Sequence, residues 1–319
     1  MLMFIEGSYW NDLVGRIGGH RAAWFDTQLT IQFGLNVEHG NLQLLLGDCE
    51  GVVFEPKRRN PSVGVLVLSG SSGQIASRRC ELLANCGALA VSIRWFGGPG
   101  QSTGICEIPL ERFISVFDEF ENQGLEKLAV IGVSKGAEAA LLLSCIDSRL
   151  DAAVAISPSA YVWANLGPGI DGVDHPYRSC WTFQGSPFPF IPYSDRWSPG
   201  REVPPSYKEL YQLSLAEFSS AAEAARIHVE IAKTNLLLVA GGDDKLWPSD
   251  EFAREIILRR KRMELESAYV YLEGAGHRPI LPGEDAPVPS NVRSYGGSEV
   301  EDRLLGEMAW EAMIDLLKL

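Results

Sequence analysis

The segment LAVIGVSKGAEAALLLSC, residues 128–145, decides the fold of this chain. It opens with an apolar run of strand length, and the residues after Ser134 have the composition and spacing of a helix. Gly132 and Gly136 flank the serine in the pattern Gly-x-Ser-x-Gly. On a sharp strand-to-helix turn, a serine hydroxyl stands above the sheet edge, and small neighbours leave room for it. Ser134 is therefore the predicted nucleophile.

The same five-residue pattern occurs a second time, as GQSTG at residues 100–104. This copy follows the glycine- and proline-rich loop WFGGPG rather than a strand, and it continues into ICEIP rather than a helix. The pattern has mechanistic meaning only in its strand–turn–helix context. The context selects Ser134 over Ser102.

Apolar runs of strand length alternate with helical segments over most of the chain after residue 51. Parallel neighbours in a sheet need a crossover connection, so the alternation predicts a mostly parallel, doubly wound α/β sheet. With the nucleophile on a strand-to-helix turn, this predicts the α/β-hydrolase fold, with the chemistry beyond the carboxyl ends of the strands. The predicted strands are Val63–Leu68, Ala88–Ile93, Leu128–Val133, Ala152–Ile156, Leu236–Ala240 and Ala268–Leu272, and the predicted helices are Ile75–Asn85, Leu110–Asn122, Lys135–Cys145, Asp250–Arg262 and Glu299–Leu317.

Two regions depart from this alternation. Residues 1–50 are predicted to form a short segment packed on or preceding a catalytic domain of residues 51–319, with strands at Leu29–Phe33 and Leu42–Leu46. The interval of about 158–234 is rich in aromatic residues and prolines. Because disordered segments carry few aromatic residues, this interval is predicted to be an ordered cap over the site, with an extra core layer as the alternative.

A serine hydroxyl needs a general base, and in this fold the partners follow along the chain in the order serine, acid, histidine. His20 and His39 precede the serine, and His175 and His228 precede the best acid. His277 stands in GAGH, just after the last predicted strand, and satisfies both order and position. It is the predicted base.

The acid is expected just after the penultimate strand, where residues 241–249 read GGDDKLWPS. Either Asp243 or Asp244 can orient the imidazole and stabilise the imidazolium that forms. The spacing usual in this turn favours Asp244, with Asp243 as the alternative.

An acyl-transfer intermediate needs two N–H donors held in advance for its oxyanion. One is expected from the backbone of Lys135, and the other from Ser71, with Ser72 close behind, in the turn after the first strong strand. Small residues in that turn let the backbone approach the substrate.

Other side chains near the nucleophile carry expectations of their own. Ser72, Trp163 and Trp247 are expected to contact the substrate. Lys135 and Glu138 lie three residues apart, so they are predicted to pair on one helix face. Attraction of an anionic substrate group by Lys135 is the alternative.

Five stretches of the chain resemble one known family: VLVLSGSSG (65–73), AVIGVSKGAEAALLLS (129–144), ARIHVEIAKTNLLLVAGGDDKLWPS (225–249), EGAGH (273–277) and YGGSEVEDRLLGEMAWEAMIDLL (295–317). They are similar to the C-terminal catalytic domain of the acyl-CoA thioesterase and bile acid-CoA:amino acid N-acyltransferase family, and more distantly to dienelactone hydrolases. The resemblance implies a triad of Ser134, Asp244 and His277 and a small-molecule acyl thioester or ester as substrate.

The chain departs from that family in two ways. Eukaryotic members carry a larger N-terminal β-sandwich than about fifty residues can supply. Amide-forming members that resemble this chain tend to use cysteine as nucleophile, whereas this chain has serine. The serine favours hydrolysis, with transfer to an amine or alcohol acceptor as the alternative.

Composition excludes several other functions. The formal net charge of −13 argues against a nucleic-acid partner and provides no attraction to anionic membranes. The six cysteines form neither a CxxC pair nor a disulfide framework, which indicates a reducing, cytoplasmic location. No signal peptide, membrane span, metal or organic cofactor is expected, and no pattern predicts an oligomeric state.

Overall fold

The structure is a computed structural model that describes residues 32–38, 41–46, 49–57 and 63–319. Within these residues, the main sheet has nine strands in the order β1-β2-β3-β5-β4-β7-β8-β11-β12. Neighbours from β5 to β12 are parallel, whereas β1, β2 and β3 pair antiparallel and extend the sheet at the β5 edge. The strands are β1 (Gln32–Glu38), β2 (Asn41–Leu46), β3 (Cys49–Phe54), β4 (Val63–Leu68), β5 (Leu89–Ile93), β7 (Lys127–Val133), β8 (Leu150–Ile156), β11 (Asn235–Gly241) and β12 (Ser267–Leu272).

The parallel part of this sheet confirms the predicted α/β architecture, since all six predicted strands are present close to their expected bounds. The strand expected at Leu42–Leu46 lies within β2. Of the strand expected at Leu29–Phe33, residues 32 and 33 begin β1, and the rest lies outside the described residues. The sequence did not predict β3, which contains the expected domain boundary near residue 51 and pairs with both β2 and β5.

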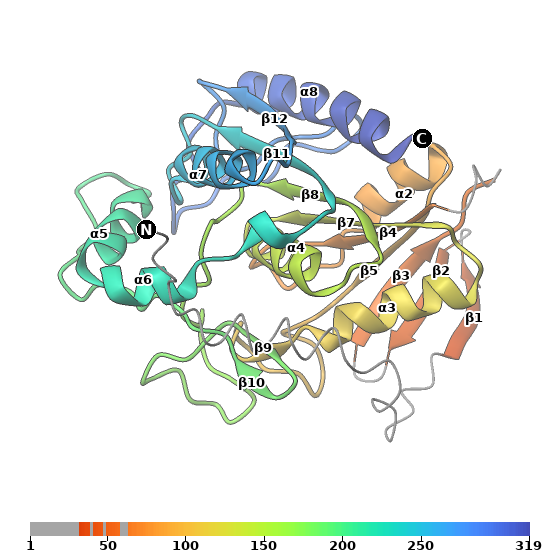
Figure 1. Ribbon diagram of the computed structural model, residues 1–319, viewed down its shortest axis with the longest axis horizontal. Helices are drawn as coiled ribbons and strands as arrows, with labels where there is room; N and C mark the ends of the chain where they lie inside the picture. The colour runs from red at the N-terminus through yellow and green to blue at the C-terminus, as the bar shows by residue number, and fades with distance from the viewer. Residues whose placement is uncertain (1–31, 39–40, 47–48, 58–62) are drawn as a thin grey trace.

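Helices cover both faces of the sheet (Figure 1). The helices α2 (Ser77–Asn85) and α8 (Glu299–Leu317) share one buried cluster, and α3 (Glu111–Asn122), α4 (Lys135–Ile146) and α7 (Ser249–Arg262) share the other. All five lie where the sequence predicts a helix. No helix in the described ranges is long and apolar enough to cross a membrane.

The two buried clusters follow from the period-two alternation of side chains along the strands. In β4, Leu66 and Leu68 belong to the cluster under α3 and α4, whereas Val65 and Val67 belong to the cluster under α2 and α8. All four are fully buried, which explains why the strand reads as one continuous apolar run. Because helices pack on both faces, the strands are held in place, and so are their carboxyl ends.

The aromatic-rich interval folds as short elements rather than as another β–α unit. It contributes β9 (Trp181–Phe183) and β10 (Ser186–Pro187), which form a small second sheet with β6 (Ile108–Pro109), and then α5 (Lys208–Glu217), α6 (Ser219–Ala225) and η1 (Val229–Ile231).

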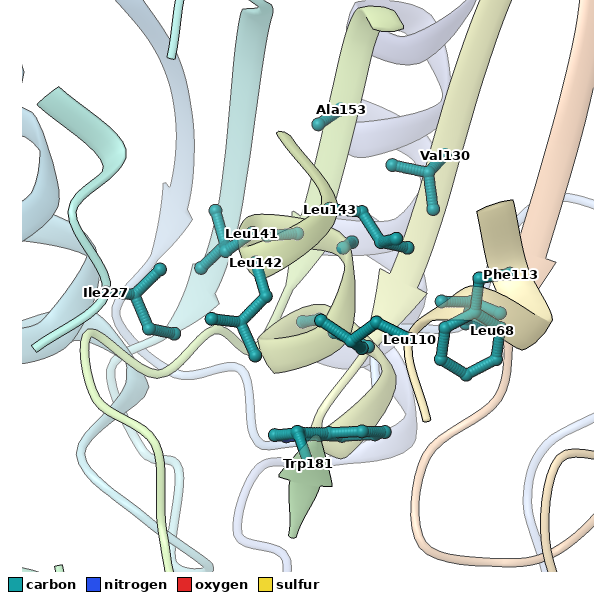
Figure 2. Close-up of a cluster of buried hydrophobic side chains, with 14 of the residues drawn as sticks. Leu68, Leu110, Phe113, Val130, Leu141, Leu142, Leu143, Ala153, Trp181 and Ile227 are labelled. Atoms are coloured by element: carbon teal, nitrogen blue, oxygen red, sulfur yellow. The ribbon is translucent and has the colours of Figure 1, made fainter. Parts of the chain in front are cut away.

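Several aromatic side chains of this interval face the main core. Trp163 and Trp181 are both fully buried and belong to the cluster under α4. Figure 2 shows Trp181 together with Leu110, Phe113 and Leu142, all members of this cluster, and the ring centroids of Phe113 and Trp181 are 6.3 Å apart. For these two tryptophans, the extra core layer describes the structure better than an open cap does.

Candidate active site

Ser134 occupies the turn between β7 and α4, as the sequence predicts. Its backbone has φ 55° and ψ −118°, a region that side chains other than glycine rarely adopt. Its N–H donates to the Ile156 carbonyl oxygen at 2.9 Å, and its own carbonyl accepts from Ala137 and Glu138 at the start of the helix. These bonds hold the serine at the carboxyl end of the sheet, in the strained conformation that raises a nucleophile above the strand ends.

Close packing around this turn accounts for its small residues. A Cβ atom at Gly132 would collide with the Gly136 carbonyl oxygen, and one at Gly136 would collide with the Ser69 carbonyl oxygen. A Cβ atom at Gly70 would lie 3.2 Å from the Cβ of Ser134. The turn after β4 therefore lies directly against the serine.

The two predicted oxyanion donors are both free to act. Neither the backbone N–H of Lys135 nor that of Ser71 donates a hydrogen bond within the part of the chain that the structure describes. Lys135 begins α4, where unpaired N–H groups and the helix dipole favour negative charge. Ser71 follows Gly70, which packs on Ser134. Ser72 is exposed, and its hydroxyl accepts from the Gln74 N–H at 3.3 Å.

His277 and Asp244 form a buried hydrogen-bonded pair. The Nδ1 of His277 lies 2.7 Å from the Oδ2 of Asp244, and the two side chains are 2% and 0% exposed. The Nε2 of His277 is also buried and has no hydrogen-bond partner within the described residues. When Nδ1 carries the proton and donates to Asp244, Nε2 is left as an acceptor, which is the state of a general base.

Both carboxylate oxygens of Asp244 accept hydrogen bonds. Its Oδ1 accepts from the backbone N–H groups of Leu246 and Trp247 at 2.9 and 3.2 Å, and its Oδ2 also accepts from the Ser249 hydroxyl at 2.6 Å. Asp243 points elsewhere, since it lies 3.0 Å from the Lys245 ammonium and accepts from Gly297 N–H. Of the two aspartates, Asp244 is the one that meets the histidine.

The order of the strands brings Ser134 and His277 to the carboxyl-end side of the sheet. Ser157, which follows β8, donates its N–H to Val239 in β11 and its hydroxyl to the His277 carbonyl oxygen at 2.8 Å. The preceding residue, Ile156, binds Ser134. Contacts therefore run from Ser134 through the end of β8 to His277. Ser157 was not predicted from the sequence; the available signal was its place directly after β8, which lies between β7 and β11.

The two tryptophans expected to contact substrate are buried. Trp163 is 0% exposed and donates its indole N–H to the Ser159 hydroxyl. Trp247 is 1% exposed, donates to the Ser157 carbonyl oxygen, and has its ring centroid 5.6 Å from that of His277. Trp247 therefore packs against His277, whereas Trp163 lies in the core layer beside α4.

Lys135 and Glu138 form an ion pair inside the protein. The Lys135 ammonium lies 2.9 Å from the Glu138 Oε2, and both side chains are almost fully buried. The other carboxylate oxygen of Glu138 accepts from the Trp181 indole at 2.9 Å and the Trp163 backbone at 3.2 Å. Burial alone would lower the pKa of Lys135, but the neighbouring Cys180 thiol and Glu138 carboxyl act in the opposite direction and raise it, while burial raises the pKa of Glu138 itself.

We expect the Glu138→Gln variant to lose about 3–5 kcal/mol of unfolding free energy, because it leaves a buried ammonium without its counter-charge. The matched control is Glu81→Gln, which breaks an exposed pair of the same spacing with Arg78 and should cost less than about 1 kcal/mol. Urea unfolding followed by fluorescence measures both.

The Lys135→Met/Glu138→Gln double variant should recover much of the loss, since it buries no net charge. If Glu138→Gln loses no more unfolding free energy than Glu81→Gln does, this account of the ion pair is contradicted.

The described residues contain no group of three or more histidine, cysteine or acidic side chains arranged to hold a metal ion.

Comparisons with known proteins identify the family of the chain. Residues 118–318 match the family model described as BAAT / Acyl-CoA thioester hydrolase C terminal. Human mitochondrial acyl-coenzyme A thioesterase 2 is 23% identical over 217 residues, which cover 67% of this chain and 42% of the relative. Mouse bile acid-CoA:amino acid N-acyltransferase is 22% identical over 84% of this chain and 62% of its own length. The chain thus spans less than two thirds of these relatives.

Solved structures support the fold. An esterase from Thermogutta terrifontis is 13% identical and matches 94% of this chain and 97% of its own, with a TM-score of 0.51. At this identity, the likeness concerns the α/β-hydrolase fold alone.

Proposed function

The chain belongs to the BAAT and acyl-CoA thioester hydrolase C-terminal family, and from that premise we propose that it is a serine hydrolase that cleaves an acyl thioester or ester through an acyl-enzyme intermediate. The observation that carries the proposal is the buried His277–Asp244 pair, whose free Nε2 lies at the same sheet edge as the strained Ser134. The names of the relatives support a thioester of coenzyme A as the substrate class.

In the proposed mechanism, the Ser134 oxygen attacks the acyl carbonyl carbon while its proton passes to His277 Nε2. The carbonyl oxygen becomes an oxyanion, which the N–H groups of Lys135 and Ser71 stabilise. Collapse of this intermediate breaks the bond to the thiol or alcohol, which leaves with the proton from the imidazolium. Water then attacks the acyl-serine by the same proton route and releases the acid.

The wild-type enzyme should release free thiol and acid from acyl-CoA substrates with a higher kcat/KM than it shows for p-nitrophenyl esters of the same acyl groups. A thiol-trapping dye and a pH indicator follow the two products in parallel. Cleavage of esters with thioesters ignored contradicts the thioester assignment and indicates a carboxylesterase. No turnover of either class, together with no labelling of Ser134 by a fluorophosphonate, contradicts the whole proposal.

Acyl transfer to an amine or alcohol is the second candidate. The similarity to rat acyl-coenzyme A amino acid N-acyltransferase 2, 31% identical over 37% of this chain, favours it. It uses the same residues and differs only in the acceptor that attacks the acyl-serine. Amide or ester formation at the expense of free acid, when glycine, taurine or a simple alcohol is added to the thioester assay, is the outcome that selects transfer.

The proposed location is the cytoplasm, because the spacing of the six cysteines is typical of a reducing compartment. The proposed partner is the small-molecule substrate.

A further inference from the structure

Asp302, in the first turn of α8, contacts the histidine loop on both sides of His277. Its Oδ1 accepts the Gly276 N–H at 2.7 Å, and its backbone carbonyl accepts the Ile280 N–H at 2.9 Å. These two contacts bracket the base, although Asp302 lies far from it in the sequence. The loop is thereby tied to α8 by a carboxylate as well as by main-chain bonds.

Other contacts leave the His277 backbone little freedom. Its N–H donates to the Tyr295 carbonyl oxygen at 2.8 Å, and its carbonyl accepts from the Ser157 hydroxyl. A Cβ atom at Gly276 would collide with the Gly296 carbonyl oxygen, so the loop lies directly against the segment that leads into α8. Among these partners, Asp302 is the one whose carboxylate hydrogen-bonds the loop; the ring of Tyr295 also lies beside it, with its centroid 5.9 Å from that of His277.

The Asp302 carboxyl is buried and interacts electrostatically with charged groups of the site. Its side chain is buried, at 8% exposure. The charged and titratable groups that face it are Arg278, Asp244 and His277. Burial raises the pKa of the Asp302 carboxyl, while the Gly276 N–H and Arg278 act in the opposite direction. The position in the first turn of a helix also favours a negative charge.

We propose that Asp302 is a positioning residue for His277, holding the base through Gly276 and Ile280 while its carboxylate stabilises the imidazolium that forms during acyl transfer. This inference rests on the proposed function, since it assigns Asp302 to a histidine that accepts a proton from Ser134. The Asp302 carboxylate makes no direct contact with the imidazole. It acts on His277 through its hydrogen bond to the loop and through the electrostatic effect of its negative charge.

Two variants separate the two parts of this role. Asp302→Asn keeps an oxygen that can accept the Gly276 N–H but removes the charge. Asp302→Ala removes both, and we expect it to lower kcat about 10- to 100-fold with little change in KM, because the base is no longer held in its productive position. Glu299→Gln is the matched control, since it makes the same chemical change on an exposed side chain of the same helix.

The readout for charge is the titration of His277, followed by NMR of ¹⁵N-histidine-labelled protein and assigned with a His277→Gln variant. Loss of a nearby negative charge disfavours the imidazolium, so Asp302→Asn should move the His277 midpoint to lower pH. The acid limb of kcat/KM should move in the same direction, with plateau kcat within about three-fold of wild type. Glu299→Gln should leave the midpoint in place.

Two results overturn the inference: wild-type kcat in Asp302→Ala, or an unshifted His277 midpoint in Asp302→Asn. A purely structural role for Asp302 predicts the second of these. If the wild-type protein turns over no thioester or ester, the proposed function fails, and the His277 titration still decides whether Asp302 acts on the histidine.

Discussion

Replacing Ser134 with alanine is expected to lower kcat by about 10⁶-fold, the scale of loss when a serine triad loses its nucleophile. The reason is that no other hydroxyl in the described structure occupies the β7–α4 turn with free N–H donors beside it. The activity that remains should be what the oxyanion donors and substrate binding supply alone. The measurement is the steady-state rate of thiol release from the best thioester found for the wild type.

Ser102→Ala is the matched control for this experiment, because Ser102 stands in the second copy of the same five-residue pattern. Its hydroxyl is buried and donates to the Gly104 carbonyl oxygen at 2.8 Å, which is a structural role. We expect its kcat to stay within a few-fold of wild type. The Ser134 hydroxyl makes no hydrogen bond within the described residues, so the Ser134→Ala protein should keep the wild-type unfolding midpoint. Equal losses of kcat in Ser134→Ala and Ser102→Ala would contradict the assignment of Ser134 as the nucleophile.

The nucleophile turn was predictable from the sequence because everything that defines it is local. A buried strand, a serine between two glycines and an apolar helix follow one another within residues 128–145, and each has a period or composition of its own. The same holds for the six parallel strands, whose burial on both faces makes them continuous apolar runs. The strand β3 escaped prediction because its first residues are only alternately buried, so it does not read as a continuous apolar run.

Contacts between distant segments were not predictable in the same way. Ser157 and Asp302 reach the His277 loop only because β8 and α8 pack beside it, and neither residue belongs to a motif that spacing reveals. Trp163 and Trp181 show a related limit. Aromatic composition indicated an ordered segment, but whether the rings face a ligand or the core depends on distant partners: the Trp181 indole donates to Glu138 in α4, and the Trp163 indole donates to Ser159.

The choice between Asp243 and Asp244 illustrates what tertiary structure adds. The two residues are adjacent and chemically identical, so spacing could only favour one of them. In the structure their surroundings differ completely. Asp244 is 0% exposed and shares its Oδ2 between Ser249 and His277, whereas the side chain of Asp243 is 41% exposed and pairs with Lys245. The assignment of the acid to Asp244 therefore rests on burial and on one 2.7 Å contact, and it can be tested by matched substitutions.

Asp244→Asn is expected to lower kcat by about 10⁴-fold while the fold is retained. The amide preserves the shape of the side chain, but its N–H₂ group can donate to Nδ1 of His277. The imidazole proton would then sit on Nε2, which is the atom that has to accept the Ser134 proton, so the base is blocked in the wrong tautomer. Circular dichroism and urea unfolding check the fold, and thiol release gives kcat.

Asp243→Asn makes the same chemical change one residue away and should lower kcat by no more than a few-fold, because Asp243 contacts Lys245 and Gly297 rather than the imidazole. A loss of kcat in Asp243→Asn as large as that in Asp244→Asn would contradict the assignment, because the His277–Asp244 contact would then not be what sets the rate. A large loss in Asp244→Asn alone, with the His277 NMR signal showing the proton moved to Nε2, links the rate directly to the buried hydrogen bond.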